Sequence, residues 1–420
     1  MDLRGFGGDN GLMETTLYEW LSFGLRWLHV ITGVAWIGSS FYFIALDLSL
    51  KKRDYLPEGV AGDAWQVHGG GFYNMRKYTV APAELPPELT WFKWESYSTW
   101  LTGFFLLCTV YYAAPELYLI DRAVMDLEPW QAIAFGIGTM AVTWVVYDLL
   151  CRSPLVEHTY LLLTVVFCFL AFVGWALTLV YTGRGAFIHL GAVTATIMSA
   201  NVAMNIIPNQ KRAVEMLKRG ETPPATYGKQ AKQRSLHNNY LTLPVLFLML
   251  SNHYPLAFAT EYNWVIAILV MVMGGVIRHW FNQHHMGSKS PDWCWAVAAI
   301  CFVGIMWLSE AGPAKAAASE EDQSALLTSP HYAAVEDVIL SRCSMCHAEE
   351  PVWEGIAIAP KDIRLETSEE IARYAPLIYA QAARSSAMPP GNLTDLQDQD
   401  RELLAIWYEE ATGRSRKLFP

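Results

Sequence analysis

The stretch HTYLLLTVVFCFLAFVGWALTLVYT, residues 158–182, contains no Asp, Glu, Lys or Arg. An α-helix needs about 20 consecutive apolar residues to cross the hydrocarbon core of a bilayer, and this stretch exceeds that length. We therefore predict a transmembrane helix over these residues.

Seven other stretches have a similar composition. The 420-residue chain is 53% hydrophobic and only 17% charged, whereas soluble domains carry about 25% charged residues. The sequence thus predicts an all-α fold: a polytopic, eight-span transmembrane bundle in residues 1–310, followed by a small second domain. The predicted spans are 18–48, 94–114, 130–151, 158–182, 186–207, 236–253, 262–283 and 292–310.

Loop charges predict the orientation of this bundle. Alternate loops hold most of the Lys and Arg residues, including Lys51, Lys211 and Lys229, whereas the N-terminal tail and the other loops hold only Arg4, Arg122 and Arg184. Because cationic loops stay in the cytoplasm, we expect a multi-pass protein of the bacterial inner membrane with both chain ends on the periplasmic side. The net charge of −10 averages a basic face with an acidic exterior. We expect contact with membrane lipid and no nucleic-acid partner.

The run Cys343-Ser344-Met345-Cys346-His347 has the form C-x-x-C-H. This pattern is typical of c-type haem attachment: Cys343 and Cys346 form thioethers with the porphyrin, and His347 ligates the iron. A zinc site is the alternative, but it would need a second Cys/His pair nearby, which the sequence lacks. Haem is attached to C-x-x-C-H outside the cytoplasm in bacteria, in agreement with the predicted orientation.

Residues 311–326 are small, polar and acidic and are predicted to be a linker. Residues 327–420 then have the size and order of an extracytoplasmic class I cytochrome c domain, with expected helices near 368–384 and 395–411. Met388, before two prolines, is the expected second axial ligand; Met345 and His331 are the competitors. Pro360 resembles the proline of that family whose carbonyl orients the proximal histidine. Thioether ligation raises the reduction potential, which suits an electron acceptor.

Polar residues inside the predicted spans are costly and commonly mark function. Two interpretations stay open: amides and imidazoles that only bridge helices, or groups that bind substrate and cofactor. The candidate catalytic residues are Arg26, Asn201, Asn205, His237, Asn238, Asn239 and Arg278. The candidate ligands of an intramembrane haem b are His29, His189, His237 and His279, although the sequence does not indicate which pair would be bridged.

Two runs carry a resemblance to a known family. RSLHNNYLTLP, residues 234–244, continues to SNHYP at 251–255, and RWLHV at 26–30 is followed by IGSS at 37–40. The chain thereby resembles the bacterial membrane-bound urate oxidase (urate hydroxylase) family, in which an eight-span catalytic domain is joined to a C-terminal cytochrome c. The resemblance covers essentially the whole chain.

This resemblance implies oxidation of urate to 5-hydroxyisourate in purine catabolism. The electrons would pass to the cytochrome c domain and on to a respiratory acceptor, without peroxide release from O₂. Urate is a planar anion that must lose two electrons and a proton and accept water at C5, so a cationic clamp, amides and a base would suffice. Since a haem takes one electron at a time, two steps or a second centre are required.

Two other functions remain as alternatives. One is a quinol-linked membrane cytochrome subunit that transfers electrons without urate chemistry. The other is a transporter with a tethered cytochrome sensor, which would leave the haem without an evident purpose.

Overall fold

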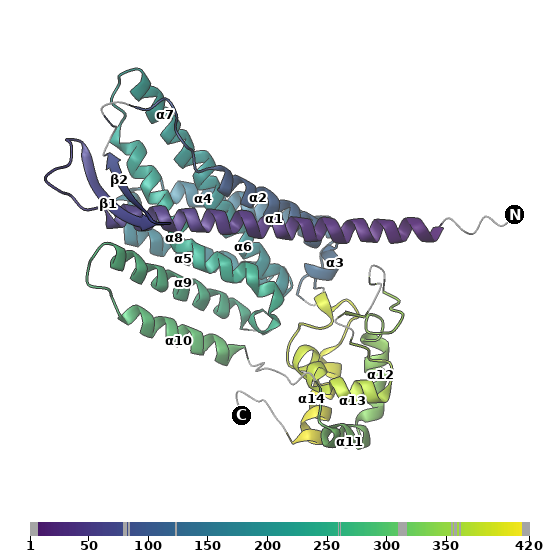
Figure 1. Ribbon diagram of the computed structural model, residues 1–420. Coiled ribbons are helices and arrows are strands. Elements are labelled where there is room, and N and C mark those ends of the chain that lie inside the picture. Colours follow the sequence, from purple (N-terminus) through teal and green to yellow (C-terminus); the bar gives the residue numbers. More distant parts are fainter. Residues whose placement is uncertain are drawn as a thin grey trace.

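The computed structural model describes residues 7–78, 82, 85–121, 124–258, 260, 262–309, 317–353, 356, 359–360 and 363–413. A long helical bundle and a smaller helical domain make up the described chain, and Figure 1 shows the smaller domain at one end of the bundle. The hairpin and helix α7 lie at the opposite end. The basic loops and the C-terminal domain are therefore at opposite ends of the bundle.

The bundle contains eight main helices and several short ones. The main helices are α1 (Gly7–Ser49), α2 (Trp94–Leu107), α4 (Pro129–Leu150), α5 (Thr159–Thr178), α6 (Gly183–Ala200), α8 (Ala225–Leu250), α9 (Asn263–His285) and α10 (Trp293–Leu308). The short helices are η1 (Cys108–Tyr112), α3 (Pro115–Tyr118), η2 (Pro154–Glu157), η3 (Asn201–Ile206), α7 (Ile207–Lys218), η4 (Ser251–His253) and η5 (Pro255–Ala257). Two of these, η1 and η3, are π-helical and continue α2 and α6 without a break.

Every predicted span coincides with a helix, but length and composition support only some of them as membrane-crossing. Among the described residues, five helical segments are long and apolar enough to cross a membrane: Thr16–Ser49, Pro129–Leu150, Thr159–Thr178, Gly183–Lys218 and Asn263–His285. Helix α10 is apolar but has only 16 residues, α2 has 14 residues and gains five more through η1, and the 26-residue α8 carries many polar groups. The structure is compatible with a membrane protein, and the number of eight crossings stays a prediction.

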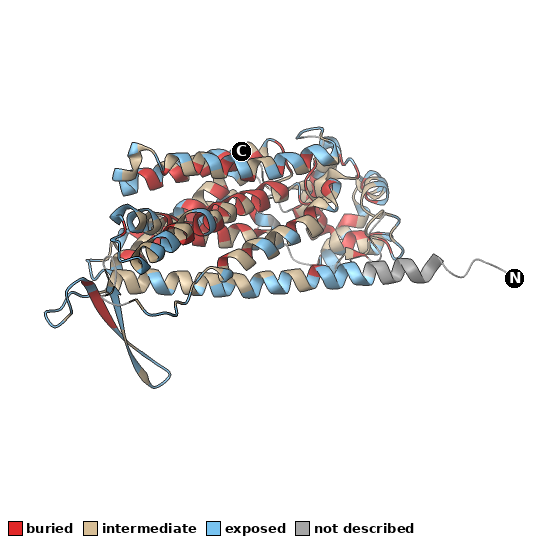
Figure 2. Ribbon diagram, turned by 90° about the horizontal axis from the view of Figure 1, so that it is seen from above, coloured by how far each residue is buried: buried red, intermediate tan, exposed pale blue. Residues whose placement is uncertain are grey.

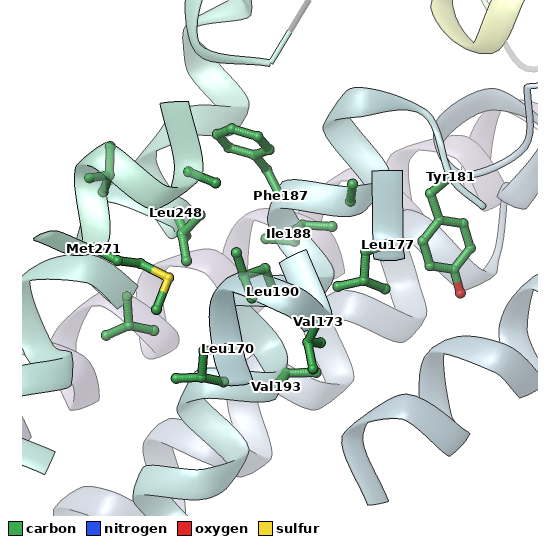
Figure 3. Close-up of a cluster of buried hydrophobic side chains, with 14 of the residues drawn as sticks. Leu170, Val173, Leu177, Tyr181, Phe187, Ile188, Leu190, Val193, Leu248 and Met271 are labelled. Atoms are coloured by element: carbon green, nitrogen blue, oxygen red, sulfur yellow. The ribbon is translucent and has the colours of Figure 1, made fainter. Parts of the chain in front are cut away.

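The bundle core lies where α5 and α6 meet, with α8 and α9 beside them. Figure 3 shows Leu170 and Val173 of α5 against Leu190 and Val193 of α6. A Cβ at Gly174 would lie 2.9 Å from Leu190 Cδ2, so glycine is what permits this close helix contact. The outward faces of the helices are largely exposed in Figure 2. Apolar residues on such a face, for example Trp27 and Ile300, are suited to lipid.

The described structure is mostly helical, as expected, and a β-hairpin between α1 and α2 is an element that the sequence analysis did not predict. Strand β1 (Val60–His68) pairs antiparallel with β2 (Gly71–Tyr78). The connecting residues Gly69 and Gly70 both have positive φ, 57° and 79°. A two-residue turn of this kind matches the twist of the strands and favours glycine, so the run His-Gly-Gly-Gly at 68–71 was the overlooked signal.

The C-terminal domain has its own core and begins inside the predicted linker. Its helices are α11 (Glu320–Thr328), α12 (Tyr332–Arg342), α13 (Ser368–Ile378), η7 (Tyr379–Ala383), η8 (Pro390–Asn392) and α14 (Asp398–Thr412). Leu326 is fully buried, and Trp407 Nε1 donates a hydrogen bond to its carbonyl at 3.0 Å. Ala318 N also donates to Arg373 O at 2.8 Å. Helix α11 therefore overlaps the predicted linker of 311–326, of which residues 311–316 lie outside the described residues. The helices expected near 368–384 and 395–411 correspond to α13 with η7 and to α14.

Candidate functional site

Asn201 lies at the centre of a buried hydrogen-bond network between α4, η3 and α8. Its Nδ2 donates to the hydroxyl oxygen of Tyr147 and to Oδ1 of Asn238, each at 2.9 Å. Its Oδ1 accepts from Arg234 Nη1 at 3.1 Å, and Arg234 Nη2 donates to Asp148 Oδ1 at 2.7 Å. Arg234 is only 2% exposed, so Asp148 supplies the counter-charge that its burial requires.

His237 belongs to the same network through Tyr147. The Tyr147 hydroxyl oxygen is 2.9 Å from His237 Nδ1. Because this oxygen already accepts from Asn201, its proton is free to be donated to Nδ1, which favours the tautomer with hydrogen on Nε2. His237 is fully buried, and its Nε2 has no hydrogen-bond partner among the described residues. Nε2 is therefore the atom of this network with capacity left to contact a ligand.

A second group, which we call the Arg278 cluster, consists of the buried residues Arg278, Asn239 and Asn282 and the half-buried Phe41. Arg278 donates to Asn239 Oδ1 from Nε at 3.4 Å and to Asn282 Oδ1 from Nη2 at 3.2 Å. Asn282 Nδ2 donates to Asn239 Oδ1 at 2.9 Å. The Phe41 ring centroid is 4.1 Å from Arg278 Cζ. These contacts join α1, α8 and α9 around a guanidinium that is 5% exposed.

Arg26 and Asn205 lie apart from these two groups. Arg26 is exposed on α1, and Asn205 Oδ1 accepts a hydrogen bond from Asn209 at 3.4 Å. The structure thus brings together five of the seven predicted catalytic residues, in two separate groups. Glu95 was not predicted, although its Oε2 is buried and has no partner among the described residues. The signal that was overlooked is a carboxylate at the start of a predicted span.

The four histidines proposed as haem b ligands are each held by a different partner. His29 Nδ1 is 3.0 Å from Thr99 O, and His279 Nδ1 is 2.8 Å from the Tyr240 hydroxyl. His189 Nδ1 donates to Gly185 O at 2.8 Å, and its Nε2 accepts from Tyr112. Within the described part of the chain, no two of these four rings are in contact. The two axial ligands of one haem lie on opposite faces of the porphyrin and do not touch each other, so these contacts leave the intramembrane haem b ligands a prediction.

The C-x-x-C-H residues do fit a c-type haem. His347 Nδ1 donates to Ile363 O at 2.9 Å, which fixes the ring and leaves Nε2 free for iron. Cys343 and Cys346 are unpaired thiols, and burial raises the pKa of the Cys343 thiol to about 12. Met388 packs against the core of this domain, and its carbonyl accepts from Arg401 at 3.0 Å.

Two expectations around this site can now be judged. Pro360 does not orient His347: its carbonyl accepts from Ile363 N at 3.3 Å in a turn, and the carbonyl of Ile363 takes its place. His331 Nε2 lies 3.1 Å from Glu410 Oε2, so this competitor for the iron has a hydrogen-bond partner at the surface. The described residues contain no group of three or more His, Cys, Asp or Glu side chains arranged around a common metal position.

The two domains meet at the loop that carries Met388. Ala387 joins the hydrophobic core of the bundle, and a Cβ at Gly391 would lie 2.6 Å from Ile120 O. Beside this contact is a cavity of about 640 Å³ lined by both domains, including Trp175, Arg184 and Arg401. The side of the C-terminal domain that faces the bundle is therefore the side of the predicted second axial ligand.

Comparison with known proteins gives one result. No match is found among curated proteins or among solved structures. The model of the family described as Urate oxidase N-terminal matches residues 15–309, which include α2 to α10 and most of α1. The match covers more than half of the chain, and the chain therefore belongs to the urate oxidase N-terminal family.

Proposed function

We propose that this protein oxidises urate to 5-hydroxyisourate in purine catabolism and that the electrons pass to a c-type haem in its own C-terminal domain, not to O₂ with release of peroxide. The observation that carries the proposal is the family match over residues 15–309, combined with a C-x-x-C-H motif in the same chain. The redox balance is simple: the urate anion and one water give 5-hydroxyisourate, two electrons and one proton.

Cys343 and Cys346 would hold the haem covalently, and His347 and Met388 would ligate its iron. When bound, the haem supplies a one-electron acceptor whose potential a methionine ligand raises. The chain's contribution is orientation. Ile363 O fixes the His347 ring, and Arg401 donates to the carbonyls of Ala382, Ser385 and Met388, at 3.0 Å for Met388. These bonds hold the Met388 loop against α14 of the same domain.

The proposal includes eight membrane crossings in the bacterial inner membrane, with the N-terminus and the C-terminal domain in the periplasm. The position of the C-terminal domain at the end opposite the hairpin and α7 supports this topology, because the loops near the hairpin and α7 are basic. A respiratory-chain component would then collect the electrons on the periplasmic side.

The test is anaerobic mixing of the purified full-length protein with urate, followed by the absorbance of the reduced c-type haem. We expect stoichiometric reduction by urate and none by hypoxanthine, and no c-type signal in a Cys343→Ser/Cys346→Ser variant. Reduction by a quinol but not by urate would establish the quinol-linked cytochrome instead. A pyridine haemochrome spectrum of the same sample tests the haem content: haem c alone would exclude the intramembrane histidines as haem ligands, and additional haem b would support them.

A further inference from the structure

Arg234 and Arg278 are both buried in the bundle, but only Arg234 has a carboxylate as its partner in the described structure. Arg234 forms an ion pair with Asp148 at 2.7 Å. Arg278 forms no ion pair with any carboxylate of the described residues, and its hydrogen-bond acceptors are the neutral amides of Asn239 and Asn282. Removing a charge from water is costly unless an opposite charge compensates it. An anionic ligand beside Arg278 would supply the charge that the protein itself does not provide.

Asn239 has a hydrogen-bond donor to offer to such a ligand. Its Oδ1 accepts from both Arg278 Nε and Asn282 Nδ2, and these two bonds determine the orientation of the amide. In the opposite orientation the Asn239 NH₂ group, itself a donor, would point at these two donors. Its Nδ2 is consequently directed away from them. Asn239 is fully buried, and Nδ2 has no partner among the described residues. A buried donor of this kind matches a carbonyl oxygen of a ligand.

The remaining surfaces of the Arg278 cluster suit a flat ligand. The Phe41 ring is 4.1 Å from the guanidinium carbon, and the Phe281 ring is 5.7 Å from it. Aromatic rings give planar conjugated molecules a stacking surface. Along α9, residues 278, 282 and 285 have the i, i+4, i+7 spacing of one helical face, and His285 Nδ1 is also buried without a partner in the described structure.

Arg278 lies closer to one end of α9 than to the other. Arg278 is seven residues from the C-terminal end of α9 at His285 and fifteen from its N-terminal end at Asn263, which corresponds to about 10 Å and about 22 Å at 1.5 Å per residue. The nearer end is the one with α7 and the hairpin, opposite the C-terminal domain. The basic end of the bundle is thus the nearer end to Arg278.

We propose that Arg278, Asn239 and Phe41 bind urate as a planar anion and that urate enters from the basic, cytoplasmic end of the bundle. The guanidinium compensates the charge of the purine, the Asn239 amide donates to a ring carbonyl, and Phe41 lies along the ring. This inference rests on the proposed function and adds to it the location of the substrate and the side of entry. Substrate and cytochrome domain are then at opposite ends of the protein.

The test is anaerobic equilibrium binding of urate to the full-length protein in nanodiscs. We expect Arg278→Gln to weaken urate binding about 100-fold, because a buried charged partner is lost, and Arg278→Lys to retain more affinity than Gln. The matched control is Arg184→Gln. Arg184 also lies over aromatic rings without a described carboxylate partner, 5.3 Å from Phe258 and 5.9 Å from Tyr118, but it lines the cavity between the domains.

Two further measurements keep the test decisive. Binding of neutral hypoxanthine should change little in Arg278→Gln, and its retention shows that this variant is folded. Urate added to inside-out vesicles should be consumed, whereas urate added to right-side-out vesicles should not. Loss of binding in Arg184→Gln with normal binding in Arg278→Gln would move the site to the cavity between the domains and overturn the inference. If the wild type neither binds nor oxidises urate, the proposed function itself fails.

Discussion

Arg234 is a single side chain on which the packing of three helical elements depends. It joins α8 to Asp148 of α4 and to Asn201 of η3. We expect Arg234→Met to destabilise the protein by about 3 kcal/mol, since it leaves a partly buried carboxylate without its main partner. Thermal unfolding in detergent measures this as a lowered Tm. The control is Arg152→Met: Arg152 pairs with the same carboxylate but is 69% exposed, so its loss should cost less than about 1 kcal/mol. Equal effects would contradict the prediction.

The sequence predicted several residues of these hydrogen-bond networks, but it did not predict which residues they contact. Asn201, His237 and Asn238 stand out in sequence because polar groups are rare in apolar spans. Tyr147 does not stand out, since an aromatic residue in a span equally suits packing or lipid, yet its hydroxyl connects Asn201 to His237. Arg26 was expected to face the interior of the bundle, but its side chain is exposed on the surface of α1. A single charge in a helix does not reveal which way the helix is turned.

At the scale of elements, contact between α4 and α6 depends on a glycine. A Cβ at Gly136 would lie 2.5 Å from His189 Nε2 and 2.8 Å from the Tyr112 hydroxyl. We expect Gly136→Ala to break the Tyr112–His189 hydrogen bond and to destabilise the bundle by about 1–3 kcal/mol, as overpacking does. Gly138→Ala is the matched control, because it lies on the same helix with nothing within 4 Å. It should leave the Tm unchanged or raise it. A lower Tm for both variants would show that the loss of stability does not come from crowding at His189 and Tyr112.

The hairpin depends on the carboxylate of Asp63. Burial opposes ionisation, but hydrogen bonds from Asn74, Tyr55 and Arg53 hold the pKa of Asp63 below its ordinary value. A depressed pKa stabilises the fold above the unfolded-state pKa of about 3.9, and this stabilisation is lost as the pH falls through the lower, folded value. Asp63→Asn should therefore increase amide exchange of β1 and β2 at neutral pH. In the wild type, exchange corrected for its intrinsic pH dependence should rise only below about pH 4. Unchanged exchange in the variant would refute this role.

The hairpin and the π-helices are elements that the sequence did not predict. The helices were predictable because a bilayer requires long apolar runs. The two short strands have no comparable pattern, and the glycines of their turn are the clearest sequence signal of the hairpin. The π-helical η3 begins at Asn201, which is held by Tyr147 and Asn238. Its geometry is tied to partners distant in sequence, which local patterns do not contain.

For the whole molecule, the division into two domains was predictable and their contact was not. The apolar spans and the C-x-x-C-H motif each define one domain, but nothing in either run indicates that η8 (Pro390–Asn392) lies against α3 (Pro115–Tyr118). The docked surface includes Ala387 and Gly391, small residues that sequence analysis reads as ordinary loop. Their importance comes only from the backbone that approaches them.

Gly391 permits this docking, and its substitution should separate the domains. It has φ of 56°, and its Cβ would lie 2.6 Å from Ile120 O and 3.0 Å from Glu116 O, which are backbone atoms that cannot move aside cheaply. We expect Gly391→Ala to weaken docking by about 1–3 kcal/mol and so to raise amide exchange in residues 115–120. Gly413→Ala is the matched control, because Gly413 has a similar φ of 64° but nothing within 4 Å. It should carry the same backbone strain without affecting that segment.

Exchange that stays at the wild-type level in Gly391→Ala would show that the docking of the domains does not depend on this contact. If exchange rises while the haem spectrum stays unchanged, slower reduction of the haem by urate would link docking to electron transfer.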